Sequence, residues 1–248
     1  MPILCVIPAR LDSARLPRKP LRLLSGEPLI RHVARRAAES GLADRVVVAS
    51  DRPEVLDTVA DLPVATSLTS AQHDSGTERV AEVAARAEYA WADVVLNVQG
   101  DEPFFPLDGA AGALAEIERG RAVGTAGGAL TPVAAANPDR VKVVVDGTGR
   151  ALRFSRILPA SAAWGCAVGV LEHVGIYAYT RRALERWVAA RPVPEERAHA
   201  LEQLRPLALG MSIGVARIEG PLPPAVDTPG DLARADRYLD SQSVRVGR

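Results

Sequence analysis

The order of apolar and amphipathic segments predicts an α/β fold, with a mainly parallel mixed sheet flanked by helices. Short β-branched runs alternate with helical stretches along the chain, which is typical of strand-helix-strand units with right-handed crossovers. The first apolar run, residues 3–7, stops at Pro8 and opens directly into a basic loop. The pattern changes once, over residues 123–154, where two β-rich runs flank the Gly-rich segment 146–149 and predict a hairpin. This region is expected to be a small mixed-sheet insertion.

Local signals place the individual elements. Gly41 suits the position just after a helix end, and Pro53 suits the first turn of the next helix. The predicted strands are residues 3–7, 45–49, 94–98, 123–130, 141–145, 174–179 and 212–218. The predicted helices are residues 28–40, 53–60, 76–89, 107–119, 181–190, 198–209 and 229–239.

Composition limits the function classes. Of 248 residues, 48% are hydrophobic and 24% are charged, with 30 acidic and 30 basic side chains, which is ordinary for a globular protein. Balanced charge and 4% aromatic residues argue against a nucleic-acid or membrane-surface partner. Two cysteines, Cys5 and Cys166, show neither a disulfide framework nor metal-ligand spacing. Because no signal peptide or transmembrane-length apolar run is apparent, a cytoplasmic enzyme is expected.

The basic loop after the first strand is the most informative segment. It carries Arg10, Arg15, Arg18 and Lys19, and cations gathered at the end of a buried strand are costly unless an anion lies among them. Ligands of open α/β sheets bind beyond the carboxyl ends of the strands. The loop therefore predicts a polyphosphate, and hence a nucleotide, although a solvated loop is the simpler alternative for any one of these residues.

Three further motifs lie at expected strand ends or helix starts. Asp101, in the segment 97–103 after an apolar run, and Asp227, before a Thr-Pro helix start, are candidate Mg²⁺ ligands, because two carboxylates plus substrate phosphates commonly hold this ion. The polar segment 73–79 enters a helix whose backbone N–H groups can bind a base edge or a phosphate. Alone, Asp101 also suits a turn, Asp227 a helix cap, and His73 an ordinary hydrogen-bonded histidine.

Taken together, these motifs closely resemble the 3-deoxy-manno-octulosonate cytidylyltransferases, also called CMP-Kdo synthetases. The resemblance runs almost from end to end and its many ordered motifs make it specific. The matching segments are 7–10, 15–17, 19–21, 50–51, 73–79, 97–103, 137–138, 141–144, 154–156, 173–177, 201–205 and 226–229.

The resemblance implies a Rossmann-like nucleotidyltransferase fold, a homodimer, and transfer of CMP from CTP to an acidic sugar with release of pyrophosphate. It implies a single domain, with residues 1–120 and 205–241 mainly for nucleotide and metal and 121–204 mainly for acceptor and dimerisation. The implied CTP-binding residues are Ala9, Arg10, Ser13, Arg15, Lys19, Ser75, Gly76, Thr77, Arg79 and Gln99, of which Arg10 and Lys19, with Asp101, are the implied catalytic residues. Mg²⁺ would be held by Asp101 and Asp227, and the acceptor would face Arg156, His173, Tyr177, Glu202 and Gln203.

The sequence departs from the family over residues 157–172, which are short, almost uncharged and without arginine. A sugar acid with many hydroxyls needs polar partners, so the departure favours a smaller acceptor, such as the phosphonate phosphonoformate; loop drift is the alternative, because loops tolerate deletion. Two alternative functions are a nucleotidyltransferase for another NTP and a nucleotide-binding regulatory module without catalysis. The motifs at 73–79 and 97–103 argue against the first, and retention of Arg10, Lys19 and both aspartates argues against the second.

Overall fold

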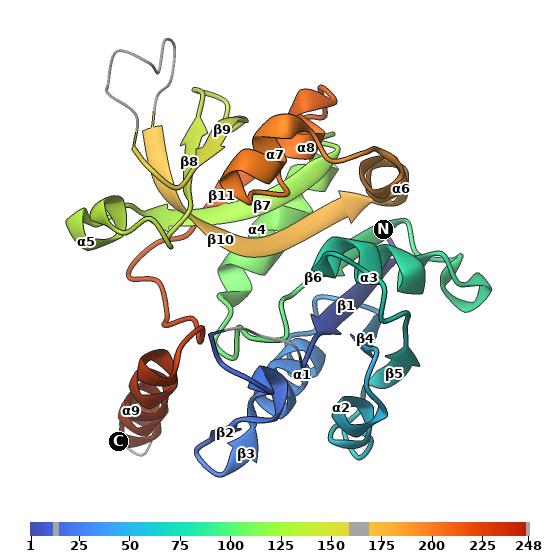
Figure 1. Cartoon of the computed structure of the whole chain (residues 1–248), viewed down its shortest axis with the longest axis vertical. Helices are drawn as coiled ribbons and strands as arrows, with labels where there is room; N and C mark the ends of the chain where they lie inside the picture. The colour runs from blue at the N-terminus through green and yellow to red at the C-terminus, as the bar shows by residue number, and fades with distance from the viewer. Residues whose placement is uncertain (12–14, 159–168, 247–248) are drawn as a thin grey trace. The chain divides into compact units, whose positions relative to one another are not determined.

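The structure is a computed structural model that describes residues 1–11, 15–158 and 169–246, with side chains through Ser241. The predicted α/β fold is confirmed: a mostly parallel mixed sheet is flanked by helices, and a small two-stranded antiparallel sheet accompanies it. The chain divides into two compact units (Figure 1). Unit 1 comprises residues 1–93, 97–105 and 223–248, and unit 2 comprises residues 94–96 and 106–222. The expected functional division near residues 120 and 205 stays a prediction.

Unit 1 is built on parallel strands in the order β1, β4, β5. Strand β1 (Ile3–Ala9) pairs with β4 (Arg45–Ser50), which pairs with β5 (Ala65–Leu68). Apolar side chains of β1 and β4 are buried, as expected for parallel strands covered on both faces. The other elements of unit 1 are η1 (Lys19–Leu21), β2 (Leu23–Leu24), β3 (Glu27–Pro28), α1 (Leu29–Glu39), α2 (Pro53–Asp57), α3 (Gly76–Ala84), η2 (Ala87–Tyr89) and α9 (Pro229–Val246).

The end of β1 lies against the segment that follows β6 (Val94–Asn97). The backbone N–H of Val98 donates to the carbonyl of Val6 at 3.2 Å, and that of Gly100 donates to the carbonyl of Pro8 at 3.2 Å. A Cβ on Gly100 would lie 2.8 Å from the same Pro8 oxygen, so only glycine permits this approach. The carboxyl end of β1 and the loop after β6 are thereby held side by side.

Unit 2 contains the mixed part of the fold. Strand β7 (Val123–Ala129) pairs in parallel with β11 (Ile213–Arg217) and antiparallel with β10 (Gly169–Thr180), and β10 pairs antiparallel with β8 (Lys142–Val145). Strands β8 and β9 (Ala151–Ser155) form the predicted hairpin. Helix α4 (Leu107–Glu118) packs on β7, β10 and β11. The remaining helices are α5 (Pro132–Ala136), α6 (Arg181–Ala189), α7 (Pro194–His199) and α8 (Leu204–Ala208).

Most predicted elements are present, with shifted ends. The predicted helix 198–209 is wrong: α7 ends at His199, Ala200 adopts a left-handed conformation with φ of 49°, and α8 begins only at Leu204. Strand β5 and the short elements β2, β3, α5 and η1 were not predicted, because runs of two to five residues carry little periodicity. Strand β10 extends to both sides of the predicted 174–179. Cys5 is a buried core residue, as expected.

Within the described residues, every helix is too short or too polar to be a candidate membrane span.

Candidate active site

Lys19 lies at the centre of a charged cluster in unit 1. Its side chain is only 8% exposed, and its Nζ lies 2.5 Å from Asp101 Oδ2 and 2.7 Å from Asp227 Oδ1. Burial lowers the pKa of Lys19, but the charges of Asp101 and Asp227 and their hydrogen bonds outweigh it, so the pKa is raised overall. Lys19 is therefore charged, and it brings together two carboxylates that are far apart in the sequence.

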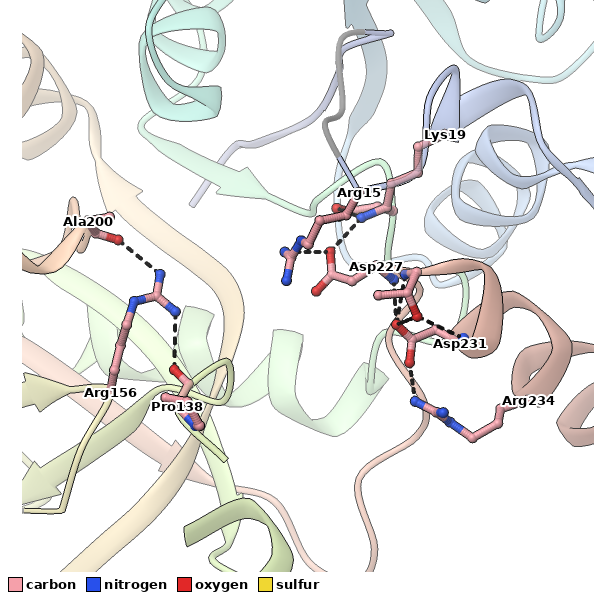
Figure 2. A network of polar contacts seen from close by, with 10 residues as sticks. Arg15, Lys19, Pro138, Arg156, Ala200, Asp227, Asp231 and Arg234 are labelled. Carbon is pink, nitrogen blue, oxygen red and sulfur yellow. Dashed lines mark hydrogen bonds and ion pairs between the residues drawn. The ribbon is translucent and has the colours of Figure 1, made fainter. Parts of the chain in front are cut away.

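Each carboxylate is placed by its own element. Asp101 follows β6 in the loop that the Gly100–Pro8 contact holds against β1. Asp227 precedes α9, whose first turn is capped from within: Asp231 Oδ2 accepts from the backbone N–H groups of Asp227 and Thr228 and from the Thr228 hydroxyl. The capping role considered for Asp227 thus belongs to Thr228 and Asp231. The Asp227 side chain is free for Lys19 and for Arg15, whose Nη2 lies 3.2 Å away (Figure 2).

The chemistry of this cluster fits a hard divalent cation. Two carboxylates converge on one ammonium group, so a positive charge already occupies the point between their oxygens. Mg²⁺ prefers such oxygen ligands and usually takes its remaining ligands from water and substrate phosphates. Within the described residues, no group of three or more potential metal ligands is present. The two aspartates therefore suit Mg²⁺ only together with a phosphorylated substrate.

Arg10 and Arg79 form a second positive feature of unit 1. Arg10 Nη1 donates to the carbonyl of Asp74 at 2.9 Å. Among the described residues, its buried Nε and Nη2 have no hydrogen-bond partner, and neither has the buried Nε of Arg79. Burial lowers the pKa of Arg79, the charge of Asp51 opposes this, and the nearby charge of Arg10 lowers it further. Buried, unpaired N–H donors on adjacent cations are what an anionic ligand would satisfy.

The start of α3 adjoins the same region. Ser75 is its N-cap and accepts from the backbone N–H of Glu78 at 3.2 Å. A Cβ on Gly76 would lie 3.3 Å from Gln99 Oε1 and 3.4 Å from Pro8 Cγ, so the helix start lies close to the ends of β1 and β6. Gln99 Nε2 donates to Asn97 Oδ1 at 3.2 Å. A helix N-terminus so placed favours a phosphate or a polar base edge.

The remaining residues predicted for CTP have different positions. Ala9 is buried at the end of β1, and Thr77 is buried in the first turn of α3. Ser13 lies outside the described residues.

Arg18, expected among the phosphate-binding cations of the loop, instead has its Nη2 2.9 Å from Glu54 Oε2. His73 Nε2 lies 2.5 Å from Glu82 Oε2, which is the ordinary hydrogen-bonded role.

In unit 2, His173 and Tyr177 lie within an aromatic cluster. Their ring centroids are 5.4 Å apart, Phe154 contacts His173 edge-on, and Tyr177 contacts Tyr179 and Trp187. His173 Nε2 is 3.0 Å from the hydroxyl of Thr125. Burial lowers the pKa of His173 to about 3 and raises that of Tyr177 well above its ordinary value. Both side chains are therefore neutral near pH 7.

Arg156 is engaged with backbone carbonyls of unit 2. Its Nη2 donates to the carbonyl of Ala200 at 3.1 Å and its Nη1 to that of Pro138 at 3.4 Å (Figure 2). Its Nε donates to the carbonyl of His199 at 3.0 Å. The guanidinium thereby ties together two segments that both carry predicted motifs. It holds the left-handed turn at Ala200, two residues before Glu202.

Glu202 and Gln203 occupy the short connection between α7 and α8. The charge of Glu202 contributes to the raised pKa of Tyr177, after burial and the charge of Tyr179. Gln203 is buried at the start of α8. The next turn is anchored by a buried ion pair, in which Arg205 Nε donates to Glu196 Oε2 at 2.9 Å and Nη2 to Oε1 at 2.5 Å. The connection is thus held from both sides.

Sequence reasoning gave no role to several residues that shape these features. Asp51 and Thr69 contact the Arg79 guanidinium, and the Asp74 carbonyl accepts from Arg10. The Ser50-Asp51 pair was part of the family resemblance and directly follows a strand. That position, at a strand carboxyl end, was the signal available for Asp51.

The sequence and the fold match those of known proteins. The family model described as "Cytidylyltransferase" matches residues 4–213, so this protein is an enzyme of the nucleotidyltransferase class. Curated proteins named 3-deoxy-manno-octulosonate cytidylyltransferase are 49% identical in Gemmatimonas aurantiaca, over 97% of this chain and 95% of that protein, and 45% identical in Methylococcus capsulatus, over 96% and 97%. The chain therefore belongs to the 3-deoxy-manno-octulosonate cytidylyltransferase family, which confirms the resemblance seen in the sequence.

Solved structures support the same conclusion. The structure of a CMP:2-keto-3-deoxy-manno-octonic acid synthetase complexed with CTP is 35% identical, with a TM-score of 0.87 over 98% of this chain and 100% of that chain. A 4-diphosphocytidyl-2C-methyl-D-erythritol synthase from Anaerococcus prevotii is 13% identical, with a TM-score of 0.62. The second likeness concerns the fold alone.

Proposed function

We propose that this enzyme transfers CMP from CTP to Kdo and releases pyrophosphate. The observation that carries the proposal is the unit 1 cluster, in which Lys19 joins Asp101 and Asp227 at hydrogen-bond distance. This cluster offers one cation and two carboxylates at the ends of a parallel sheet, where such folds bind ligands. The relatives named above supply the identity of the two substrates.

In unit 1, we assign the triphosphate to the basic residues and the cytidine to the start of α3. Arg10 and Arg79 offer unpaired N–H donors to anionic oxygens. Arg15 and Lys19 contact carboxylate oxygens, and phosphate oxygens are anionic acceptors of the same kind. The backbone around Gly76 and the amide of Gln99 are suited to the base or ribose, because their donors and acceptors lie close together. The residues proposed here for CTP are Ala9, Arg10, Ser13, Arg15, Lys19, Ser75, Gly76, Thr77, Arg79 and Gln99.

The reaction requires little covalent chemistry from the protein. The acceptor oxygen attacks the α-phosphorus of CTP in line with the departing pyrophosphate, the new P–O bond forms as the bond to the β-phosphate oxygen breaks, and the acceptor proton passes to solvent. Protein groups position the reactants and neutralise charge. Arg10 and Lys19 stabilise negative charge on the leaving pyrophosphate, because both are cations placed at the strand end. Lys19 also keeps Asp101 and Asp227 together.

Asp101 and Asp227 would hold the Mg²⁺ ion. When bound, the ion would act as a Lewis acid that lowers the negative charge on phosphate oxygens. The two carboxylates would fix its position, since each is anchored by its own loop contacts: Asp101 beside Gly100, and Asp227 before the Thr228–Asp231 cap.

In unit 2, we assign the acceptor to Arg156, His173, Tyr177, Glu202 and Gln203. Neutral His173 and Tyr177 can hydrogen-bond to sugar hydroxyls without placing a charge against apolar surroundings. Glu202 and Gln203 lie on a connection that the Arg156 contacts and the Arg205–Glu196 pair hold in place. Rigid polar groups of this kind discriminate between hydroxylated acceptors.

The comparisons do not support a small phosphonate acceptor. The curated relatives named above are named for 3-deoxy-manno-octulosonate. The departure that favours a smaller acceptor lies in residues 157–172, of which 159–168 lie outside the described residues. Kdo is therefore the acceptor proposed here.

The homodimer and the cytoplasmic location stay predictions, to be checked by light scattering and by cell fractionation.

The test is pyrophosphate release from CTP and Mg²⁺, with Kdo and phosphonoformate as parallel acceptors and with ATP, GTP and UTP in place of CTP. We expect release only with CTP and Kdo, and CMP-Kdo as the product by mass spectrometry. Release with phosphonoformate alone would overturn the choice of acceptor. CTP binding without release in the presence of any acceptor would favour the regulatory alternative.

A further inference from the structure

The Arg79 guanidinium is held on one side by two strand ends. Asp51, directly after β4, places its Oδ1 3.0 Å from Arg79 Nη2, and both side chains are almost fully buried. Thr69, directly after β5, accepts a hydrogen bond from Arg79 Nη1. The two strand ends are themselves joined, because the Thr69 backbone N–H donates to the carbonyl of Ser50 at 2.9 Å. Asp51 thus takes part in a frame that leaves Arg79 little freedom.

This frame uses only part of the hydrogen-bonding capacity of the two neighbouring arginines. Among the described residues, Arg79 Nε, Arg10 Nε and Arg10 Nη2 are buried without a partner. A buried donor without a partner destabilises the folded state. An ordinary structural ion pair would have no reason to keep a second guanidinium nearby with two donors unsatisfied, since like charges repel. The arrangement is expected of a site that an anion completes.

We infer that Asp51 is a positioning residue, which with Thr69 orients Arg79 so that Arg79 and Arg10 together bind one anionic group of the substrates. The inference rests on the proposed function, because it names the group that this part of the site would bind. The group is an oxyanion, from either a CTP phosphate or the carboxylate of the acceptor. Asp51 acts only through Arg79, and its own oxygens are taken by Arg79 and by Arg52, whose Nε is 3.3 Å from Oδ2.

The test compares Asp51→Asn, Asp51→Glu, Arg79→Met and the Asp51→Asn/Arg79→Met double variant in steady-state assays with CTP and Kdo. We expect Asp51→Asn to raise the KM for one substrate about tenfold, with a smaller change in kcat, because a charge-assisted hydrogen bond is lost. Asp51→Glu should recover most of this. A raised KM for CTP assigns the anion to a phosphate, and a raised KM for Kdo assigns it to the carboxylate.

The double variant separates positioning from a direct effect. If Asp51 acts through Arg79, Asp51→Asn adds no further change in KM once Arg79 is Met. A full additional increase in that background, or unchanged KM values in a folded Asp51→Asn protein, would overturn the inference. Asp61→Asn is the matched control, because Asp61 also accepts two hydrogen bonds from an arginine, Arg31, at the surface of unit 1; its KM values should equal those of the wild type.

The folding of the variants and the activity of the wild-type protein are both checked. If thermal unfolding shows that Asp51→Asn does not fold, Thr69→Val releases the same guanidinium from its neutral partner; unchanged KM values in that variant would then overturn the inference. Wild-type protein without pyrophosphate release would contradict the proposed function itself. Active wild-type protein with unaffected variants contradicts only the role of Asp51.

Discussion

Lys19 and Asp227 are 208 positions apart in the chain, yet the Nζ of one lies 2.7 Å from the Oδ1 of the other. The same ammonium group lies 2.5 Å from Asp101. A single buried lysine therefore holds the two carboxylates that we propose as ligands of the divalent cation. A change in the charge of this cluster should therefore alter both its affinity for Mg²⁺ and the stability of unit 1.

Replacing Lys19 with Met should destabilise the protein by about 2 kcal/mol and increase its stabilisation by Mg²⁺. Breaking a buried ion pair costs roughly 3–5 kcal/mol, but Asp101 and Asp227 are 38% and 43% exposed, so solvent screening reduces the loss. With the ammonium gone, Mg²⁺ can occupy the point between the carboxylates and stabilise the folded state by mass action. Thermal unfolding with and without Mg²⁺ measures both effects.

The control is Arg18→Met, which removes a neighbouring cation whose partner is Glu54. Its response to Mg²⁺ should match that of the wild type. An equal Mg²⁺ response in Lys19→Met and wild type would contradict the coupling between Lys19 and the cation site.

Changing Asp101 to Asn should lower kcat on the order of 100-fold or more, as expected when a group that stabilises transition-state charge is lost, while the fold is retained. The substituted side chain is nearly isosteric and partly exposed, so the core is untouched. Asp93→Asn is the matched control, because it alters an exposed carboxylate just before the same strand, β6. Pyrophosphate release and circular dichroism report the two properties; a near-normal kcat in Asp101→Asn with Mg²⁺ would refute the metal-ligand role.

Changing Glu196 to Gln should destabilise unit 2 by roughly 3–5 kcal/mol, because it leaves the Arg205 guanidinium buried without its counter-charge. The Arg205 and Glu196 side chains are 4% and 11% exposed, so little screening is available. Urea unfolding of this variant and of Glu195→Gln, an exposed neighbour in the same helix turn, measures the difference. Equal stability of the two variants would show that the buried pair contributes little.

His173 should make the stability of the protein fall as the pH is lowered. Its pKa is about 3 in the folded state and roughly 6.5 when unfolded, so below pH 6.5 the unfolded chain binds a proton that folded His173 does not. The stabilisation is complete above that pH and is lost as the pH falls towards 3. Between pH 7 and 5, wild-type protein should lose about 2 kcal/mol more than His173→Asn, as measured by urea unfolding.

NMR can follow the titration of His173 separately from that of the other histidines. Of the four histidine imidazoles, that of His173 should show no NMR titration between pH 5 and 8. A midpoint near 6.5 for His173 would show that the ring is solvated rather than buried.

Strands β1 and β4 of unit 1 and the hairpin of unit 2 were predictable, because they leave strong local signals. Residues 3–7 and 46–49 are continuous apolar runs, and the hairpin has a Gly-rich turn directly after the Val-rich run 141–145. The predicted helix 198–209 failed for a tertiary reason. Ala200 adopts a left-handed conformation, and Arg156 donates to the carbonyls of His199 and Ala200, so a side chain distant in sequence takes acceptors that a continuous helix would use.

The candidate site likewise includes residues that the sequence pointed to and one that it did not. Arg10, Lys19 and Asp101 were recognisable as candidates because they lie in segments that follow predicted strands, and Asp227 because it precedes a predicted helix start. The role of Asp51 was not, because its importance depends on a contact with Arg79. A carboxylate after a strand is common, and nothing in its local sequence tells which cation it will meet.

By itself, the sequence determined the family, the α/β class and the residue types available for nucleotide chemistry, because these are carried by composition, periodicity and ordered motifs. Only the tertiary structure decided which charges are partners: Lys19 with Asp101 and Asp227, Arg18 with Glu54, Arg79 with Asp51, and Arg156 with backbone carbonyls. The physical reason is that burial and distance set the strength of a charge interaction, and both arise only when distant segments pack together.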